Sequence, residues 1–289
     1  MKTQLLLPVI ISSFLLLSAC SGGGNSPDNS PDNSPDDTAT QSGVFIDSPV
    51  EGLSYASATL NGITDANGTF SYKTNETVTF SIGDITLGST AGAAVITPLD
   101  IVIGATSETD PVVTNIARFL QTLDDDGDPN NGITISTTVS NLAAGKSIDF
   151  MLSISDFENN GNVQTVIAEL TASTSAGART LVTASQAQVH MNGSLIALLS
   201  GNYSGSFSGG DSGTFSITID NNGTITGTGQ GSDGAFSISG SVNSNGSAAA
   251  GDATTGADFV MNINRDGSIS GTWTNSTFGL SGTLVASKN

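Results

Sequence analysis

A turn that recurs in the last part of the chain constrains the fold more than any other sequence feature. The segments Asp220-Asn-Asn-Gly223, Asn243-Ser-Asn-Gly246 and Asn264-Arg-Asp-Gly267 follow one another at intervals of 23 and 21 residues. An Asx residue in first place and a glycine in fourth place are typical of a type I turn that ends in a left-handed glycine and joins antiparallel strands. Each interval holds two short strands, so residues 200–289 are predicted to form a series of β-hairpins.

The hairpin series predicts about eight short strands in up-and-down order. Such strands can close into a small barrel, which removes exposed sheet edges and leaves an interior filled by side chains. An open β-sandwich is the alternative. The pattern resembles avidin-like and lipocalin-like barrels in architecture alone, and the resemblance implies no ligand. The side chains expected in the interior are Tyr203, Phe215, Ile217, Ile225, Phe236, Ile238, Phe259, Met261, Ile269, Trp273 and Phe278.

Residues 43–199 are predicted to form one α+β domain. Short segments between residues 44 and 87 alternate apolar and polar residues and are bounded by Gly, Asn and Asp, which predicts the strands of a β-sandwich-like fold. The segment Gly62-Ile-Thr-Asp-Ala-Asn-Gly68-Thr-Phe-Ser-Tyr72 resembles the hairpin of carboxypeptidase-regulatory-like and prealbumin-type modules. The resemblance implies that Asp65 and Gly68 build a turn and that Phe70 and Tyr72 enter a strand.

About three helices are expected between residues 97 and 199. The first begins at Pro111, which is well placed in a first turn, and carries an apolar stripe as far as Leu123. The second is capped by Asp156 or Asn159, and the third starts at Thr183. We expect the helices to cover one face of the N-terminal sheet; a domain break near residue 130 is the alternative.

Residues 1–19 are predicted to be a lipoprotein signal peptide. The apolar run from Leu5 to Leu17 is too short to span a bilayer permanently. The following Leu17-Ser18-Ala19-Cys20 resembles the lipobox of bacterial lipoproteins. The resemblance implies cleavage before Cys20, diacylglycerol on its thiol, an acyl chain such as palmitate on its amino group and, with Ser21 next, an outer-membrane location. An ordinary signal peptide with an incidental cysteine is the alternative.

Residues 20–42 are predicted to be a disordered tether. Ser-Pro-Asp-Asn begins at Ser26 and Ser30, and a third copy at Ser34 ends in Asp-Asp. Without aromatic residues or apolar periodicity, such a segment cannot offset the entropy lost on ordering. The regular prolines keep it extended, so the tether would hold the folded part away from the lipid surface. The membrane is therefore one expected partner.

The charge balance excludes nucleic acid as a partner. The chain has 26 acidic residues against seven Lys and Arg, a formal net charge of −19, so it lacks the basic surface that would neutralise a row of phosphates. Only 11% of the residues are charged, which is well below the usual share and favours an extracellular β-rich protein over a cytosolic enzyme.

The acidic segment from residue 124 to residue 131 is the candidate metal site. Its carboxylate and amide oxygens are ligands that Ca²⁺ prefers, and neighbouring carboxylates repel one another without a cation. The predicted ligands are Asp124, Asp126, Asp128 and Asn130. Pro129 stands where an EF-hand loop needs glycine, so the segment is more similar to the Asp-x-Asp-Gly-Asp loops of extracellular calcium-binding repeats. A solvated connection at the unfavourable end of a helix dipole is the alternative.

Catalytic motifs are weak. The segment Gly210-Asp-Ser-Gly213 resembles the nucleophile segment of chymotrypsin-like proteases, but the single histidine, His190, stands only 22 residues before the serine. Such a serine needs a histidine base oriented by a third group, so the segment is predicted to be a hairpin turn. Acid pairs such as Asp156 with Glu158, or Glu51 with Asp47, would serve a glycosidase only at a set separation, which sequence spacing does not give.

We therefore expect a non-catalytic outer-membrane lipoprotein that faces the periplasm or the cell surface. Its expected role is adhesion or another extracellular interaction, with a glycan or matrix protein as partner, as a resemblance to adhesin-like surface lipoproteins implies. The alternative is a carbohydrate- or small-ligand-binding accessory lipoprotein that uses the C-terminal barrel. Trp273 and Tyr203 are weak candidate binding residues, because aromatic rings stack on sugars but a small barrel also needs them in its core. An enzyme of envelope glycans is the third choice.

Overall fold

The computed structural model describes residues 39–289. The predicted signal peptide, Cys20 and the tether as far as residue 38 lie outside the described residues. The last residues of the predicted tether are part of the fold, because strand β1 (Thr40–Phe45) includes them and pairs with β5 (Thr69–Lys73). Among the described residues, the first strand therefore begins at Thr40, before the predicted domain start at Gly43.

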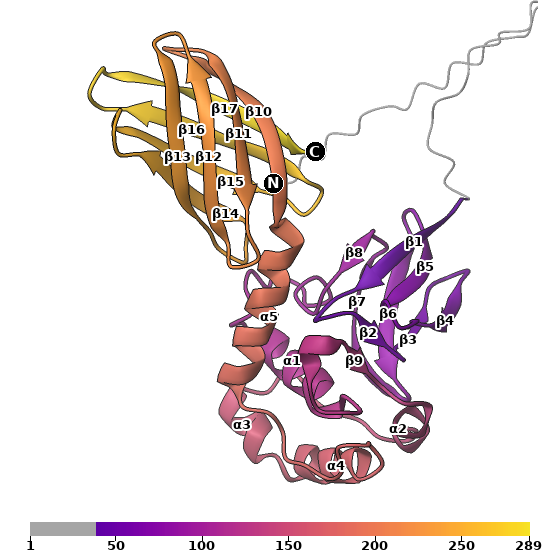
Figure 1. The fold of residues 1–289 in the computed structure, drawn as a ribbon. Coiled ribbons are helices and arrows are strands. Elements are labelled where there is room, and N and C mark those ends of the chain that lie inside the picture. Colours follow the sequence, from indigo (N-terminus) through magenta and orange to yellow (C-terminus); the bar gives the residue numbers. More distant parts are fainter. Residues whose placement is uncertain (1–38) are drawn as a thin grey trace, which may run out of the picture. The chain divides into compact units, whose positions relative to one another are not determined.

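The C-terminal residues form a closed barrel of eight antiparallel strands (Figure 1). Each strand pairs with its neighbour in the chain, and the last strand pairs with the first. The predicted mainly β fold is confirmed, and of the two alternatives for this region the barrel is correct. The strands are β10 (Gly201–Gly209), β11 (Gly213–Ile219), β12 (Thr224–Gly231), β13 (Gly234–Val242), β14 (Ser247–Asp252), β15 (Ala257–Ile263), β16 (Ser268–Asn275) and β17 (Leu280–Lys288).

The three Asx–Gly turns have the predicted geometry. In each turn the glycine N–H donates to the carbonyl oxygen of the Asx residue, at 2.9 to 3.0 Å. The φ angles of Gly223, Gly246 and Gly267 are 80°, 85° and 84°, in the left-handed region that glycine adopts without steric cost. The Asp220 carboxylate also accepts from the N–H of Thr224 at 2.8 Å. The same turn geometry therefore occurs three times and joins the strands of these hairpins.

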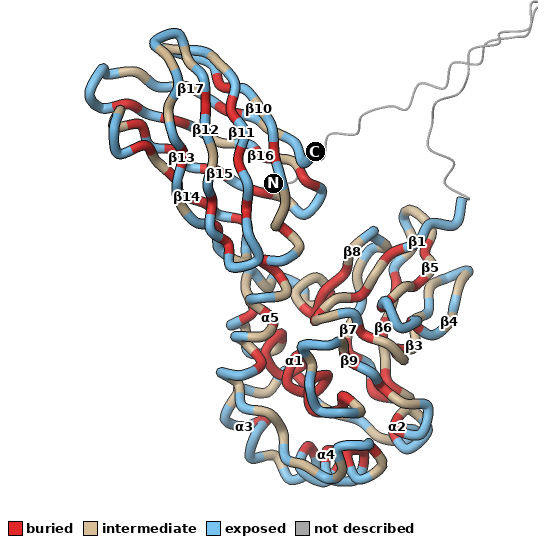
Figure 2. The backbone as a smooth tube through the Cα atoms, in the orientation of Figure 1, coloured by how far each residue is buried: buried red, intermediate tan, exposed pale blue. Residues whose placement is uncertain are grey.

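The barrel interior contains most of the predicted side chains, and buried and exposed residues alternate along its strands (Figure 2). Phe278 is the exception: it lies in a loop with 65% of its surface exposed, so its predicted core position is wrong. Phe236 is only partly buried. The interior also contains side chains that were not predicted, among them small alanines and Phe207, Ile219, Val242, Ile263 and Leu284.

Two sheets pack face to face in the N-terminal region and a short parallel pair lies beside them, as far as the described residues go. One sheet has the order β5-β1-β8 and the other β4-β3-β6-β7, and β2 pairs with β9. Phe45 and Phe70 of the first sheet contact Phe80 of the second, with ring centroids 4.7 and 5.1 Å apart. The remaining strands are β2 (Val50–Glu51), β3 (Ser54–Ala56), β4 (Asn61–Ile63), β6 (Thr77–Ile82), β7 (Ile85–Ala91), β8 (Val95–Ile96) and β9 (Ile133–Thr134).

The turn predicted at Asp65 and Gly68 forms, but it does not join a hairpin. The Asp65 carboxylate accepts from the N–H of Thr69 at 2.8 Å, and Gly68 has a φ of 73°. Phe70 is buried in the following strand β5, as expected. However, β4 pairs with β3 while β5 pairs with β1, so the turn carries the chain from one sheet to the other.

Five α-helices and one 3₁₀ turn occur within residues 39–289, two helices more than predicted. Pro111 begins the first and Thr183 caps the last, as expected, and a capping box with Gln186 completes the second cap. The middle prediction was wrong in detail, because two short helices are capped separately by Ser153 and Asn160. No helix in this part of the chain is long and apolar enough to cross a membrane. The helices are α1 (Pro111–Leu123), η1 (Pro129–Asn131), α2 (Thr137–Leu142), α3 (Ile154–Asn159), α4 (Gly161–Thr171) and α5 (Ala184–Leu199).

One end of the barrel, called here the docked end, carries the three Asx–Gly turns and contacts the N-terminal region. Arg265, in the third turn, donates to both carboxylate oxygens of Asp100, at 2.5 and 2.6 Å. Ser244, in the second turn, donates to Glu108 at 2.8 Å. Leu199, the last residue of α5, packs into the barrel core. Desolvation raises the pKa of Asp100, but the bonds from Arg265 and Thr97 outweigh it and hold that pKa below its ordinary value.

Replacing Arg265 with alanine should weaken this junction. Because the pair is bidentate and only partly exposed, we expect the free energy of unfolding to fall by about 1 kcal/mol in urea denaturation. Lys146→Ala is the control. It removes an ion pair between Lys146 and the half-exposed Glu169, and this pair lies away from the barrel. Equal effects of the two substitutions would mean that the Asp100 contact contributes no more than an ordinary surface pair.

Candidate functional site

The barrel end opposite the docked end, called here the open end, is the strongest candidate site. Up-and-down order places four loops there: β10–β11, β12–β13, β14–β15 and β16–β17. They surround a cavity of about 110 Å³. The aromatic side chains lining it are Phe207, Phe236, Phe259, Trp273 and Phe278. The open end therefore has the apolar concave form that small-ligand sites usually have.

Phe207 stands at steep angles to two other rings of the open end, whereas Phe236 and Phe259 are stacked at 13° with centroids 6.0 Å apart. Phe207 meets Phe236 at 72° and Trp273 at 80°, with both pairs of ring centroids 5.7 Å apart. The Trp273 indole N–H donates to the Ser208 carbonyl at 3.1 Å, which fixes the orientation of the indole. Four of the five aromatic residues come from strands, so the walls of the cavity are held by the barrel itself.

The two weak candidates for ligand binding do not lie together. Trp273 lines the cavity, although only 5% of its surface is exposed. Tyr203 lies inside the barrel near the docked end, is 1% exposed, and donates its hydroxyl to the Leu199 carbonyl at 2.7 Å. Burial raises the pKa of Tyr203. Tyr203 is therefore a core residue, whereas Phe278, which was assigned to the core, is the exposed ring at the cavity.

Two carboxylates stand at the rim of the cavity. Asp211 accepts from the Ser212 N–H at 2.7 Å, and its pKa is held below the ordinary value by hydrogen bonds from Ser232 and Ser212. Asp233, in the β12–β13 loop, also lines the cavity. The ion pairs found among the described residues include neither of these acids. The segment Gly210-Asp-Ser-Gly213 is a hairpin loop, as predicted, and it supplies one of the rim charges.

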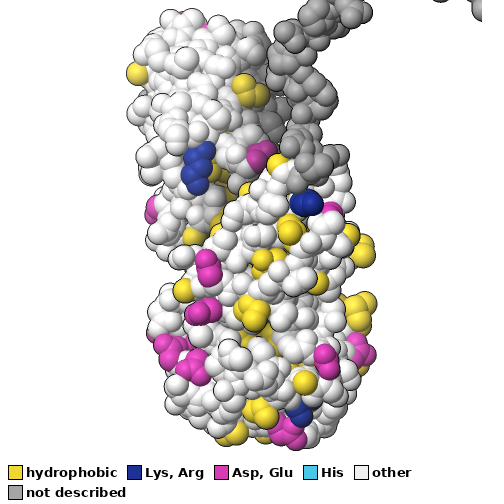
Figure 3. All heavy atoms as spheres, turned by 90° about the vertical axis from the view of Figure 1, so that its right-hand side faces the viewer, with side chains coloured by type: hydrophobic (Ala, Val, Ile, Leu, Met, Phe, Trp, Pro, Cys, Tyr) yellow, Lys and Arg dark blue, Asp and Glu magenta, His cyan; other side chains and the backbone are white. Residues whose placement is uncertain are grey.

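The barrel region holds two basic side chains, and neither lines the cavity. Arg265 is paired with Asp100 at the docked end. Lys288 lies over the ring of Tyr203, 5.9 Å from its centroid, near the same end. On the face drawn in Figure 3, most of the barrel surface is neutral, and the acidic side chains gather over the N-terminal region. The barrel region thus has six acidic side chains against two basic ones, and two of the six acids stand at the rim of the cavity.

The predicted calcium loop is folded tightly on itself. Asp126 accepts from the Asp128 N–H and from the Asn131 side chain, both at 2.9 Å, and Asp128 accepts from the Asn130 side chain at 2.8 Å. Asp124 is 1% exposed, and its Oδ1 accepts from the Thr134 N–H at 2.9 Å. Among residues 39–289, no three His, Cys, Asp or Glu side chains gather to hold a metal ion. Calcium binding stays a prediction.

Asp124 has an unusual environment that the sequence did not reveal. Its Oδ2 is buried without a hydrogen-bond donor, and its only carboxylate neighbour in contact is Asp126. Burial raises the pKa of Asp124 to about 6, and a shared proton would join the two carboxyl groups. The cation beside them is Arg179, which donates to the backbone carbonyls of Thr122 and Asp124 from 55 residues away in sequence. This arginine offsets part of the acidic charge and was missed in the sequence.

His190 contacts a serine, but the pair is not arranged for nucleophilic catalysis. His190 and Ser48 line a groove of about 900 Å³. His190 Nε2 lies 3.2 Å from Ser48 Oγ and 2.7 Å from the Asp47 backbone carbonyl. A carbonyl only accepts, so Nε2 must carry a proton and cannot take one from the serine. Asp47 is fully buried, which raises its pKa well above the ordinary value despite hydrogen bonds from Gln121.

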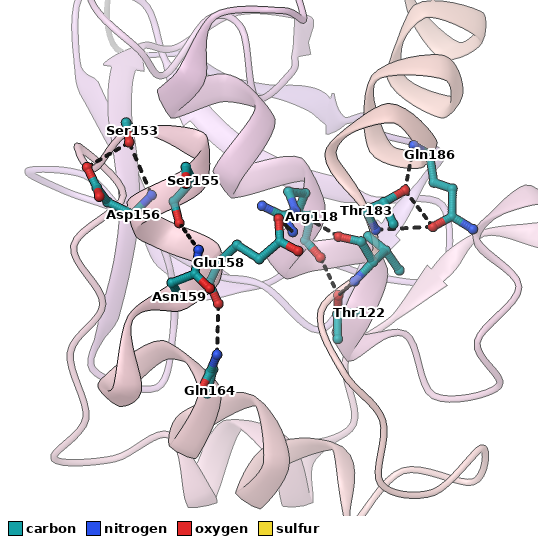
Figure 4. Close-up of polar contacts among 11 residues, drawn as sticks. Arg118, Thr122, Ser153, Ser155, Asp156, Glu158, Asn159, Gln164, Thr183 and Gln186 are labelled. Atoms are coloured by element: carbon teal, nitrogen blue, oxygen red, sulfur yellow. Dashed lines mark hydrogen bonds and ion pairs between the residues drawn. The ribbon is translucent and has the colours of Figure 1, made fainter.

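The acid pairs considered for glycosidase chemistry point to different partners (Figure 4). Asp156 accepts from the Ser153 hydroxyl at 2.7 Å, as part of the cap of α3. Glu158 turns to the other side and contacts Arg118, whose Nη2 lies 3.3 Å from its Oε2. Asp47 is bonded to Gln121 and its former candidate partner Glu51 to Thr134. The two acids of each pair are therefore bound to different partners and are not set to act together.

Comparison with known proteins adds no family to this description. No protein-family model matches the chain, and no curated protein matches it significantly.

Replacing Asp124 with asparagine should change the pH dependence of stability. A carboxyl whose pKa is raised on folding stabilises the fold fully below about pH 4, and this contribution is lost as the pH rises through about 6. Asparagine keeps the acceptor for Thr134 and imitates the protonated acid. We expect the variant to gain roughly 1–3 kcal/mol over the native chain between these pH values, measured by urea denaturation.

The same variant serves to test calcium binding. If Ca²⁺ binds at Asp124, Asp126 and Asp128, millimolar Ca²⁺ should raise the melting temperature of the native chain at pH 7 and leave the Asp124→Asn variant unchanged. Mg²⁺ is the control cation, because it demands a smaller and more rigid ligand set. An unchanged native melting temperature would make the calcium prediction wrong and leave the pH effect as it is.

Proposed function

We propose that this chain is a membrane-anchored, non-catalytic binding protein whose binding site is the open end of the barrel. The observation that carries the proposal is Phe278, a large aromatic side chain that is 65% exposed beside a cavity with four further rings in its walls. Exposed aromatic residues next to an apolar cavity are typical of binding sites, since their burial on contact with a ligand is favourable.

The position of this site agrees with display toward a partner. The docked end is occupied by Arg265, Ser244 and their acidic partners, and Leu199 fills the core there. The open end faces away from these contacts, because successive loops of an up-and-down barrel alternate between its two ends. The partner that we favour is an extracellular molecule, which fits the sequence-based expectations of a lipobox and an extended tether.

The proposal does not include catalysis. The serine nearest to the single histidine meets a nitrogen that already donates to a carbonyl. The acid pairs that glycoside hydrolysis would need are engaged separately. An adhesion or ligand-capture role needs neither arrangement, only a surface that excludes water on contact.

Replacing Cys20 with serine should release the protein from the membrane. The anchor is proposed from the lipobox, and each buried methylene of an acyl chain contributes about 0.8 kcal/mol to membrane binding, so the loss of several chains should abolish it. The measurement is the distribution of the protein between detergent and aqueous phases, with mass spectrometry of the mature N-terminus. Ser21→Ala is the control and should stay in the detergent phase. A Cys20→Ser chain that remains there would contradict the proposed anchor.

Phe278→Ser should weaken binding to any partner recognised by the open end. We would probe an array of glycans and matrix proteins with the soluble Cys20→Ser chain and expect signals to fall roughly tenfold or more on losing this ring. Val260→Ser is a matched control, because Val260 is 64% exposed on the outer face of the barrel. Binding that both variants retain would place the binding site elsewhere and overturn the proposal.

A further inference from the structure

We propose that the open-end cavity recognises the head of an organic cation, such as a quaternary ammonium group. This inference rests on the proposed function, because it names the chemical class of ligand for the same site. The features that carry it are the aromatic walls, the two unpaired carboxylates at the rim, the placement of the barrel's basic residues at the other end, and the small size of the cavity.

The aromatic walls are suited to a cation. An alkylammonium group is attracted to the faces of aromatic rings, and several rings that enclose it from different sides form the cage by which quaternary ammonium ligands are recognised. Phe207 stands nearly perpendicular to both Phe236 and Trp273, at 72° and 80°, while Phe236 and Phe259 are stacked at 13°. The rings therefore line the cavity in more than one orientation. Phe278 is exposed and is free to pack on the outer side of a ligand.

The rim charges select the same class of ligand. Hydrogen bonds lower the pKa of Asp211, so that residue is a carboxylate at neutral pH. Asp211 and Asp233 have no ion-pair partner within the described part of the chain, and no Lys or Arg lines the cavity. A neutral apolar ligand would remove water from these carboxylates and give nothing in return, which is unfavourable. A cation would replace that water with direct attraction.

The volume argues against a larger neutral ligand. At about 110 Å³ the cavity is below the range of roughly 300–1,000 Å³ that holds a drug-sized molecule, so it suits one compact group. A sugar ring needs hydrogen-bond partners for several hydroxyls, whereas most of the lining is aromatic or aliphatic. The charged side chains of the lining are both carboxylates, which again suits a ligand that carries positive charge.

The test compares choline with its uncharged isostere 3,3-dimethylbutan-1-ol. Trp273 is the only tryptophan in the chain and lines the cavity, so its fluorescence reports on binding in the full-length Cys20→Ser protein. We expect choline to change the emission with a Kd on the order of 1 mM and to bind roughly tenfold more tightly than the isostere. Binding should weaken as the ionic strength rises, because the rim carboxylates are partly exposed.

Variants that remove a single carboxylate show whether the rim charge is responsible for choline binding. Asp233→Asn should weaken choline binding several-fold and leave the binding of the isostere unchanged, since the Asp233 side chain makes no hydrogen bond or ion pair within residues 39–289 that asparagine would lose. Asp258→Asn removes the same charge from an exposed position of β15 outside the cavity and should leave choline binding unchanged. Circular dichroism of each variant excludes unfolding as the cause.

The outcomes separate this inference from the proposed function. If choline and its isostere bind equally, and Phe278→Ser abolishes both, the preference for a cation is overturned while the open end remains a binding site. If neither compound changes the Trp273 emission, the inference is overturned, and the proposed function is then decided by the array and the Phe278 variant. If Asp258→Asn weakens choline binding as much as Asp233→Asn, general charge and not the rim explains the affinity, which also overturns the inference.

Discussion

The pairing of β17 with β10 is the contact on which the barrel depends. Seven residue pairs, from Tyr203 with Lys288 to Gly209 with Gly282, join the two strands and remove the only sheet edges that an up-and-down series would leave exposed. Closure also limits the volume of the interior, and glycines leave space there for the large rings. A Cβ at Gly282 would lie 2.6 Å from the indole nitrogen of Trp273, and a Cβ at Gly229 would overlap the ring of Phe236. The large rings are accommodated because glycines stand opposite them.

Closure makes the two ends of the barrel different. The Asx–Gly turns are short, repeated and internally hydrogen-bonded, and they dock through Arg265 and Ser244. The loops at the open end do not share this turn motif. They leave Phe278 exposed beside a cavity that Phe207, Phe236 and Trp273 do not fill. Because the N-terminal region covers one end of the closed barrel, only the other end is open to a ligand. The topology therefore decides where the candidate site lies.

The sequence predicted what depends on local rules and missed what depends on distant contacts. The Asx–Gly turns, the start of α1 at Pro111 and the start of α5 at Thr183 each depend on a few neighbouring residues, and all were predicted. Whether β4 and β5 pair with each other depends on which sheet each one joins, and the local turn at Asp65 carries no information about that. Arg179 beside the acidic loop is invisible to periodicity, because a remote segment places it there. The exposed position of Phe278 has a local cause that periodicity also misses: the Asn275 side chain accepts from the N–H groups of Thr277 and Phe278, and Gly279 has a φ of 67°.

Burial also changes the meaning of the formal charge. Among the 26 acidic side chains, Asp47 and Asp124 have raised pKa values because they are buried, so they hold protons more tightly than the count assumes. The rim acid Asp211 behaves in the opposite way, because hydrogen bonds favour its charged form. Within the folded region, burial thus favours the protonated form at Asp47 and Asp124, whereas hydrogen bonds favour the charged form at acids near the surface such as Asp211 and Asp220. Since fields from exposed charges extend over about 10 Å at moderate salt, the rim carboxylates and not the net charge govern what approaches the open end.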